Sequence, residues 1–109
     1  MTQLASLTCS ERHGAALDPA AASQYMEQVS GWTMNPGNKG IHRDFKFKTY
    51  YAAVAFVNAV AWIAHREDHH PDIVLGYDKV TVTYATHSVG GLSENDFICA
   101  AKVNALGTV

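Results

Sequence analysis

Residues 49–71 read TYYAAVAFVNAVAWIAHREDHHP and predict a long helix over 50–68. Thr49 is a suitable N-cap, and Pro71 ends the helix because proline disfavours helical geometry in the residue before it. The apolar residues of this helix form two surfaces, one of Ala53, Phe56, Val57, Val60 and Ala64 and one of Val54, Ala61 and Trp62. A helix that is apolar on more than one side is usually buried on more than one side, which favours contact with a second subunit over burial within a monomer.

The segments on either side of this helix predict two pairs of strands and two further helices. Asp18 and Pro19 have the residue types of an N-cap and a first helical position, and Ser93 with Asp96 resembles a capping box. Alternating apolar and polar residues indicate half-buried strands. The elements expected outside the long helix are a helix over 19–29, strands over 32–35, 41–48, 73–75 and 79–87, and a helix from 94 to about 106. The sequence therefore predicts an α+β two-layer domain of order α-β-β-α-β-β-α, in which a four-stranded antiparallel sheet carries three helices on one face.

Length and composition limit the class of protein. The 109 residues fit a single domain over 1–109, in which residues 1–16 are expected to be loosely structured. Hydrophobic residues make up 48% and charged residues 17%, which is typical of a globular chain rather than a disordered one. No apolar run reaches the ~18 residues of a membrane span, and a net charge of −2 gives no general attraction to nucleic acid. Two cysteines are too few for a disulfide scaffold, and the sequence begins without the basic region of a signal peptide, so a cytoplasmic location is expected.

Histidine is concentrated in one part of the chain. Four of the six histidines lie between positions 65 and 87, namely His65, His69, His70 and His87. His69 and His70 are expected where the long helix breaks, and His87 at the end of a strand. Element ends are where a rigid scaffold presents side chains to a cleft, and clustered titratable groups there predict a functional site.

Three interpretations of this cluster compete. As surface residues, the histidines would only stabilise helix ends through their positive charge. As metal ligands, His65 and His69 have the spacing of a helical chelate with His87 as a third ligand, but the sequence has no H-E-x-x-H motif and neither cysteine is near. As acid–base groups, one histidine can protonate a leaving oxygen while another removes a proton, which is what a dehydration requires. No nucleophile motif, phosphate loop or dinucleotide fingerprint is visible, and this favours the acid–base interpretation.

The motifs around these histidines, taken together, resemble the pterin-4a-carbinolamine dehydratase family. The residues that carry the resemblance are Asp68-His69-His70-Pro71-Asp72, Tyr77, Thr86-His87, Gly91-Leu92-Ser93-Glu94, Asp96, Gly31-Trp32 and Arg43-Asp44-Phe45-Lys46-Phe47. The likeness covers most of the chain apart from residues 1–16. His65 departs from the pattern, because many members carry an acidic residue four positions before the first histidine of the pair.

The resemblance implies an activity that spacing alone does not. Members of this family dehydrate 4a-hydroxytetrahydrobiopterin to quinonoid dihydrobiopterin, which recycles the cofactor of aromatic amino-acid hydroxylases. They use no metal and no bound cofactor, and they form homodimers or homotetramers. A small-molecule pterin is thus the expected partner, with no direct contact to nucleic acid or a membrane. The alternative function is that of a binding partner, since some relatives stabilise a transcription-factor dimer or assist the assembly of another enzyme.

The resemblance also implies roles for individual residues. Catalytic roles fall to His69, His70 and His87, and substrate-binding or orienting roles to Asp96, Trp32, Asp68 and Thr86. His70 is the expected acid, and either His69 or His87 is the base. Two of the other residues have a structural alternative. Capping of the last helix is an equal expectation for Asp96, and core packing is the stronger expectation for Trp32.

Overall fold

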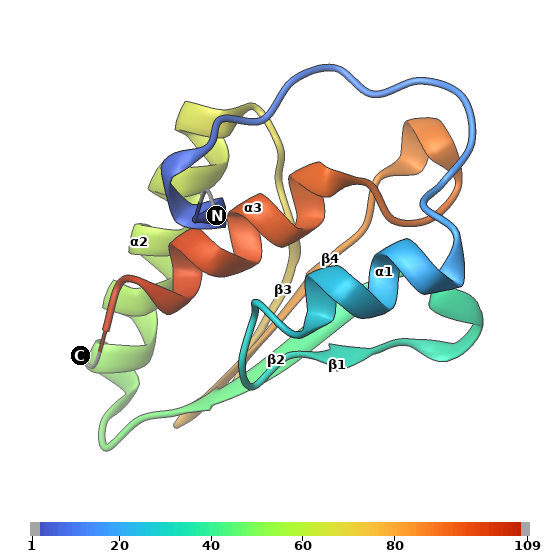
Figure 1. Cartoon of the computed structure of the whole chain (residues 1–109). Coiled ribbons are helices and arrows are strands. Elements are labelled where there is room, and N and C mark those ends of the chain that lie inside the picture. The colour runs from blue at the N-terminus through green and yellow to red at the C-terminus, as the bar shows by residue number, and fades with distance from the viewer. Residues whose placement is uncertain (1–2, 108–109) are drawn as a thin grey trace.

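The computed structural model describes residues 3–107, and within them three α-helices cover one face of a four-stranded antiparallel sheet (Figure 1). The elements in chain order are α1 (Pro19–Met26), β1 (Thr33–Met34), β2 (Ile41–Lys46), α2 (Tyr50–Glu67), β3 (Asp72–Leu75), β4 (Lys79–Tyr84) and α3 (Glu94–Asn104). The described residues also contain three short 3-10 helices, η1 (Leu4–Ser6), η2 (Pro36–Asn38) and η3 (His87–Val89). The predicted α+β class and the order α-β-β-α-β-β-α are confirmed.

The helices begin at the capping residues that the sequence predicts. The side chains of Asp18 and Thr49 each accept a backbone hydrogen bond at the start of α1 and of α2. The end of α1 differs from the prediction, since the helix ends at Met26 rather than at Val29. The backbone N–H groups of Gln28 and Val29 bond to carbonyls three residues back, in tight turns that lead to Gly31 with its positive φ of 87°.

The strands are ordered β1-β2-β4-β3, so that β2 and β4 form the centre of the sheet. Their pairing runs from Ile41 opposite Tyr84 to Lys46 opposite Lys79. This register buries every second residue of β4, including Tyr84, under the helices. Tyr84 is therefore fixed at the point where the central strand reaches the end of the sheet.

The prediction that His87 ends a strand is wrong. The strand ends at Tyr84, and residues 87–89 form η3 instead of continuing the sheet. The strand does not continue because the chain turns back on itself after Ala85. Thr86 pairs with Gly91 in an isolated bridge, and Gly90 within this loop adopts a positive φ of 70°. His87 thus lies in a loop next to the sheet rather than in its last strand.

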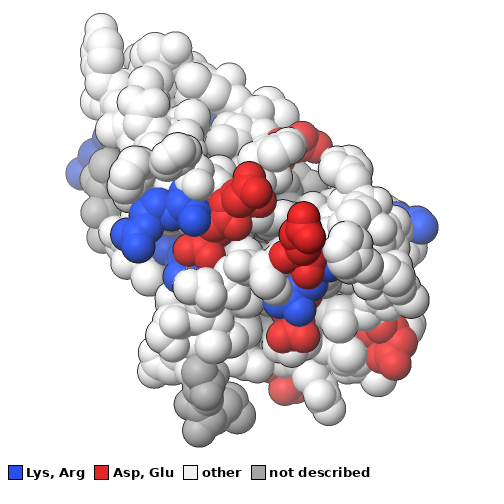
Figure 2. All heavy atoms as spheres, turned by 90° about the horizontal axis from the view of Figure 1, so that it is seen from above, with Lys and Arg blue, Asp and Glu red and all other residues white. Residues whose placement is uncertain are grey.

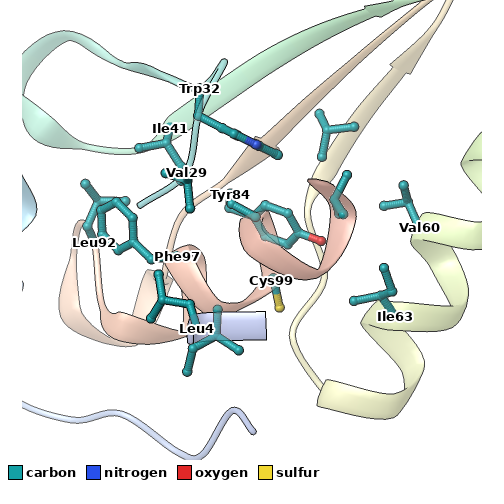
Figure 3. Packing of buried hydrophobic residues seen from close by; sticks show 14 of the residues in the cluster. Leu4, Val29, Trp32, Ile41, Val60, Ile63, Tyr84, Leu92, Phe97 and Cys99 are labelled. Atoms are coloured by element: carbon teal, nitrogen blue, oxygen red, sulfur yellow. The ribbon is translucent and has the colours of Figure 1, made fainter. Parts of the chain in front are cut away.

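The core lies between the sheet and the helices, as Figure 3 shows for the part around Tyr84 and Phe97. In α3, seven of the eleven residues are buried, which makes it the most enclosed helix. The residues that α2 buries are Ala53, Phe56, Val60 and Ile63. Val57 and Ala64 of the predicted stripe are half-buried, and Trp62 of the second apolar surface is 60% exposed. Although α2 is long and apolar, no helix in residues 3–107 has the length and apolarity that a membrane crossing needs.

Residues 3–16 contain one regular turn, η1, and otherwise run as an extended segment over the helices (Figure 1). Leu4 is buried in the core, and the Lys102 ammonium donates a hydrogen bond to the carbonyl of Ala5 at 2.9 Å. Further along, the backbone N–H of Cys9 donates to the Glu67 carboxylate at 2.8 Å. The segment is therefore attached to α3 and to the end of α2 before it reaches α1.

The charged side chains on the helix side are mixed in sign. Figure 2, which is seen from above, shows Lys and Arg next to Asp and Glu rather than a patch of one sign. Two ion pairs of this kind join Lys102 to Glu67 and Arg12 to Glu94, each with a nitrogen–oxygen distance of 3.7 Å.

Candidate active site

The break at the end of α2 places His69. Asp68 adopts the left-handed conformation with φ 52° and ψ 44°. The backbone N–H groups of Asp68 and His69 both bond to the carbonyl of Ala64, which closes the last turn. Pro71 then prevents another helical turn because its ring fixes φ and it has no N–H to donate. The chain therefore leaves the helix at His69 and enters β3.

The first turn of α3 places Asp96. One carboxylate oxygen, Oδ2, accepts hydrogen bonds from the backbone N–H of Ser93 at 2.9 Å and from the Thr86 hydroxyl at 2.8 Å. The hydroxyls of Thr86 and Ser93 are themselves 2.7 Å apart. The Ser93 side chain accepts from the backbone of Asp96 in return, so the capping box predicted from the sequence is confirmed.

His69 and Asp96 meet across these two element ends. The imidazole Nε2 lies 2.7 Å from Oδ1 of the carboxylate. The Asp96 side chain is fully buried and that of His69 is 12% exposed. A buried carboxylate needs hydrogen-bond partners to offset its lost hydration, and the imidazole, a hydroxyl and a backbone N–H supply them here. Asp96 thus caps α3 and also holds His69, the two roles that the sequence left as alternatives.

This contact fixes the proton arrangement of the imidazole. Because the carboxylate only accepts, Nε2 carries the hydrogen of the shared bond and Nδ1 carries the lone pair of the neutral ring. Nδ1 makes no hydrogen bond with any of residues 3–107. The imidazole is therefore held at one nitrogen, while the other is available to accept a proton.

Tyr84 supports the face of the same imidazole. The two rings are 5.8 Å apart between centroids and inclined by only 12°. The Tyr84 hydroxyl is buried without a hydrogen-bond partner among the described residues. Burial, followed by the neighbouring Cys99 thiol, raises the pKa of Tyr84, so the phenol stays neutral. Tyr84 therefore contributes an aromatic surface to His69 rather than a proton.

A cavity of about 340 Å³ lies beside this network. Its lining consists of residues 9–13, Glu67, Asp68, His69, Thr86, Ser88 and Asn95. Three residues predicted from the sequence thus share one cavity, namely Asp68 and His69 at the end of α2 and Thr86 in the loop after β4. The volume is in the range of small-molecule sites, roughly 300–1,000 Å³.

His70 and His87 lie next to the network in the chain but not in this cavity. Both side chains are exposed, and neither makes a side-chain hydrogen bond or an ion pair with the part of the protein that the structure describes. His70 directly follows His69, and His87 directly follows Thr86. The structure therefore brings His69, Thr86 and Asp96 into contact and leaves the other two histidines accessible to solvent.

Trp32 lies in the core and does not line the cavity with His69. Its side chain is 6% exposed and packs against the rings of Phe45 and Tyr84. The indole Nε1 donates a hydrogen bond to Asn104 at 2.9 Å. This is the core-packing placement that the sequence analysis considered the stronger expectation for Trp32.

The structure gives the metal-site interpretation no support. His65 is exposed on α2 and lies against the Trp62 ring at 5.5 Å, whereas His69 is bound to Asp96. Over positions 3–107, no three His, Cys, Asp or Glu side chains form a group that could hold a metal ion.

Sequence reasoning did not identify three residues of this site. The alternation in β4 predicts that Tyr84 is buried, but not that it stacks on His69. Asn95 lies within the predicted capping box but was assigned no role there, and Arg12 lies in a segment with no regular pattern. Arg12 and Asn95 come together at 3.0 Å through a contact between residues 83 positions apart, which no local signal could indicate.

Comparison with known proteins relates this site to one family. The model of the family described as pterin 4 alpha carbinolamine dehydratase matches residues 15–106. Two bacterial relatives carry the name "Putative pterin-4-alpha-carbinolamine dehydratase". The relative from Stenotrophomonas maltophilia (strain K279a) is 53% identical over 105 residues, which are 94% of this chain and 90% of the relative. The relative from Nitrosospira multiformis is 55% identical over 105 residues, which are 94% and 91% of the two chains.

Two solved structures share the fold. The crystal structure of a transcriptional coactivator/pterin dehydratase from Brucella melitensis has a TM-score of 0.79 and 36% sequence identity, over 84% of this chain and 97% of that chain. A pterin dehydratase-like protein, described as a RuBisCO assembly factor in the alpha-carboxysome, has a TM-score of 0.62 and 26% identity, over 72% and 93% of the two chains.

Proposed function

Since the chain belongs to the pterin 4 alpha carbinolamine dehydratase family, we propose that it converts 4a-hydroxytetrahydrobiopterin to quinonoid dihydrobiopterin and water by histidine acid–base catalysis. The observation that carries this proposal is the 2.7 Å contact of His69 with buried Asp96 beside a cavity of about 340 Å³. A carboxylate behind an imidazole holds the ring in one tautomer and stabilises it when it gains a proton.

The reaction requires two proton transfers. The hydroxyl on C4a is a poor leaving group, so an acid must protonate its oxygen while the C4a–O bond breaks. The electron pair of that bond leaves with the oxygen as water, the electron pair on N5 forms the C4a=N5 double bond, and a base takes the N5 proton. One proton is given and one is taken, so the reaction needs neither a metal nor a bound cofactor. Each positioned acid or base contributes roughly 10²–10⁴ to the rate.

The arrangement of the histidines supports different roles for them. His69 is the base, because Asp96 occupies its Nε2 and leaves Nδ1 with a lone pair. His70 is the acid, because it follows His69 directly and its exposed side chain has no partner within residues 3–107. His87, in the loop after β4, binds the edge of the pterin. Thr86 acts through Asp96, whose carboxylate it orients.

We also propose that the protein works as a homodimer or homotetramer in the cytoplasm. β3 forms one edge of the sheet, and its Val74 side chain is 67% exposed. An open strand edge favours pairing with a second chain, and the exposed Trp62 on α2 adds apolar area for association.

A second candidate function is that of a binding partner for another protein. The observation in its favour is the apolar surface of α2, on which Tyr51 is 83% exposed in addition to Trp62. The names of the two similar structures, which include a coactivator and an assembly factor, point in the same direction. An intact His69–Asp96 pair favours the enzyme, since a protein that only binds another has no use for it.

Turnover of the carbinolamine tests the proposal. Freshly generated 4a-hydroxytetrahydrobiopterin is mixed with the purified protein in a stopped-flow instrument, and the formation of quinonoid dihydrobiopterin is recorded. We expect substoichiometric protein to accelerate this step well above the uncatalysed rate. A folded protein that leaves the uncatalysed rate unchanged contradicts the proposal and favours the binding partner.

A further inference from the structure

The N-terminal segment 9–13 forms one wall of the cavity that contains His69. This part of the chain lies outside the family match, which begins at residue 15, and the roles proposed above do not use it. Polar side chains of α2, η3 and α3 hold the backbone of this segment beside the site.

Asn95 is the main anchor of this segment. Its side chain is buried, and its amide oxygen accepts hydrogen bonds from the backbone N–H of Ser10 at 3.2 Å and from Nε of Arg12 at 3.0 Å. Its amide nitrogen donates to the carbonyl of Ser10 at 2.7 Å. The neighbour of Asp96 in α3 therefore holds the segment as Asp96 holds His69.

Two further contacts fix the ends of the segment. The Ser88 hydroxyl in η3 donates to the carbonyl of Arg12 at 2.8 Å. The Glu67 carboxylate at the end of α2 accepts from the backbone N–H of Cys9 at 2.8 Å. The segment thus bridges the same elements that supply Thr86 and His69 to the cavity.

Arg12 is the cationic side chain of this wall. Its side chain is 26% exposed, with Nε bound to Asn95 and one terminal nitrogen 3.7 Å from Glu94. A guanidinium has five N–H donors, and these two contacts leave the remaining donors available to a ligand. Because Asn95 and Ser88 hold both the guanidinium and the backbone of Arg12, little conformational freedom is lost when a ligand binds.

A pterin offers acceptors that match such a group. Its pyrimidine ring carries a carbonyl oxygen at C4, next to the carbon that loses the hydroxyl. We infer that segment 9–13 is part of the substrate-binding site and that the Arg12 guanidinium donates hydrogen bonds to the pyrimidine ring of the pterin, at the C4 carbonyl oxygen. This inference rests on the proposed function, and it concerns substrate binding rather than proton transfer.

The first experiment replaces the guanidinium and keeps the length of the side chain. In Arg12→Met, we expect the Kd for biopterin and the KM for the carbinolamine to rise about tenfold, as for the loss of a partly exposed charged hydrogen bond. We expect kcat to stay within about threefold, because the protons are transferred elsewhere. Arg66→Met is the matched control, since Arg66 is an exposed arginine of α2 that does not line this cavity, and it should leave Kd and KM unchanged.

The second experiment loosens the segment. Ser88→Ala removes the hydrogen bond to the Arg12 carbonyl, and we expect a rise in Kd and KM of about threefold with no loss of the fold. Ser6→Ala is its control, because Ser6 makes a similar exposed bond to the carbonyl of Gln3 at 2.8 Å, away from the cavity. Biopterin binding is measured by titration of its fluorescence, and each variant is checked by thermal unfolding.

The outcomes separate this inference from the proposed function. A wild-type protein that turns over the carbinolamine, together with an Arg12→Met variant of unchanged Kd and KM, overturns the inference and leaves the proposed function intact. A wild-type protein that neither binds biopterin nor turns over the carbinolamine overturns the proposed function and the inference with it. A selective rise of Kd and KM in Arg12→Met and Ser88→Ala supports the inference.

Discussion

Replacing Asp96 with asparagine should remove the base while keeping the shape of the site. In the wild type, Oδ2 accepts from the Ser93 N–H and the Thr86 hydroxyl, and Oδ1 accepts from Nε2 of His69. An asparagine has only one acceptor oxygen, and this oxygen must stay at the Oδ2 position because an NH₂ there would face the N–H of Ser93. The NH₂ then points at His69, whose Nε2 must become the acceptor while the ring hydrogen moves to Nδ1.

This exchange of tautomer gives the magnitude of the effect. With its lone pair on Nε2 and turned to the amide, His69 cannot take the N5 proton, and we expect kcat to fall about as much as in His69→Ala, by roughly tenfold, because water or a remaining imidazole replaces the base in part. KM should change only a few-fold, because no contact to the pterin is removed. A charge-assisted hydrogen bond is replaced by a neutral one, so the free energy of unfolding should fall by about 1–2 kcal/mol and Tm by roughly 5–15 °C.

Stopped-flow dehydration of the carbinolamine measures the rate, and circular dichroism with thermal unfolding verifies the fold. Asp44→Asn is the matched control, because Asp44 also accepts a hydrogen bond from a threonine hydroxyl, that of Thr81 at 2.6 Å, but on the exposed face of the sheet. It should leave kcat unchanged. A folded Asp96→Asn variant with kcat within threefold of the wild type would refute the role of His69 as the base.

Further perturbations test stability, metal dependence and assembly. Burial raises the pKa of Tyr84, and the hydrogen bond to Cys9 together with burial raises the pKa of Cys99, so both stay protonated in the folded protein. In the unfolded chain, the pKa of a cysteine is about 8.5 and that of a tyrosine about 10. The contribution of each group to the free energy of unfolding is therefore complete below its unfolded pKa and is lost as the pH rises above it. The free energy of unfolding should fall by up to about 1.4 kcal/mol per pH unit for each group that ionises, and a Tm that stays constant from pH 8 to 10.5 would contradict this. Dialysis against EDTA should leave turnover unchanged, whereas a loss that zinc restores would favour a metal mechanism. Trp62→Glu should shift the sedimentation profile toward smaller species while Gln24→Glu, at an exposed position of α1, should not; a wild-type protein that is monomeric at micromolar concentration would contradict self-association.

The order of elements was predictable because most elements begin or end with a local signal. Asp18, Thr49 and Ser93 each cap a helix where the sequence places them, and Pro71 follows the break of α2. The end of β4 was not predictable in this way. It depends on the pairing of Thr86 with Gly91 across a loop, which alternation along the strand does not reveal.

The candidate site likewise combines residues that the sequence indicates with contacts that only the folded chain reveals. The family resemblance placed Asp96 near the histidines, but the direct contact with His69 joins residues 27 positions apart and is visible only in the folded chain. The anchoring of Ser10 by Asn95 joins residues 85 positions apart, in a segment that the sequence analysis expected to be loosely structured. Such contacts depend on how the elements pack and not on any local pattern.

The central claim is that histidines of this site transfer the protons of the dehydration, and three single substitutions test it most directly. Initial rates of carbinolamine dehydration are measured for the wild type, His70→Ala, His69→Ala and His87→Ala, each with a thermal check of the fold. We expect the wild type to exceed the uncatalysed rate, His70→Ala to lose about 10²-fold or more, and His69→Ala and His87→Ala to lose less, because water or a remaining imidazole replaces them in part. Full activity in all three folded variants would contradict the histidine mechanism.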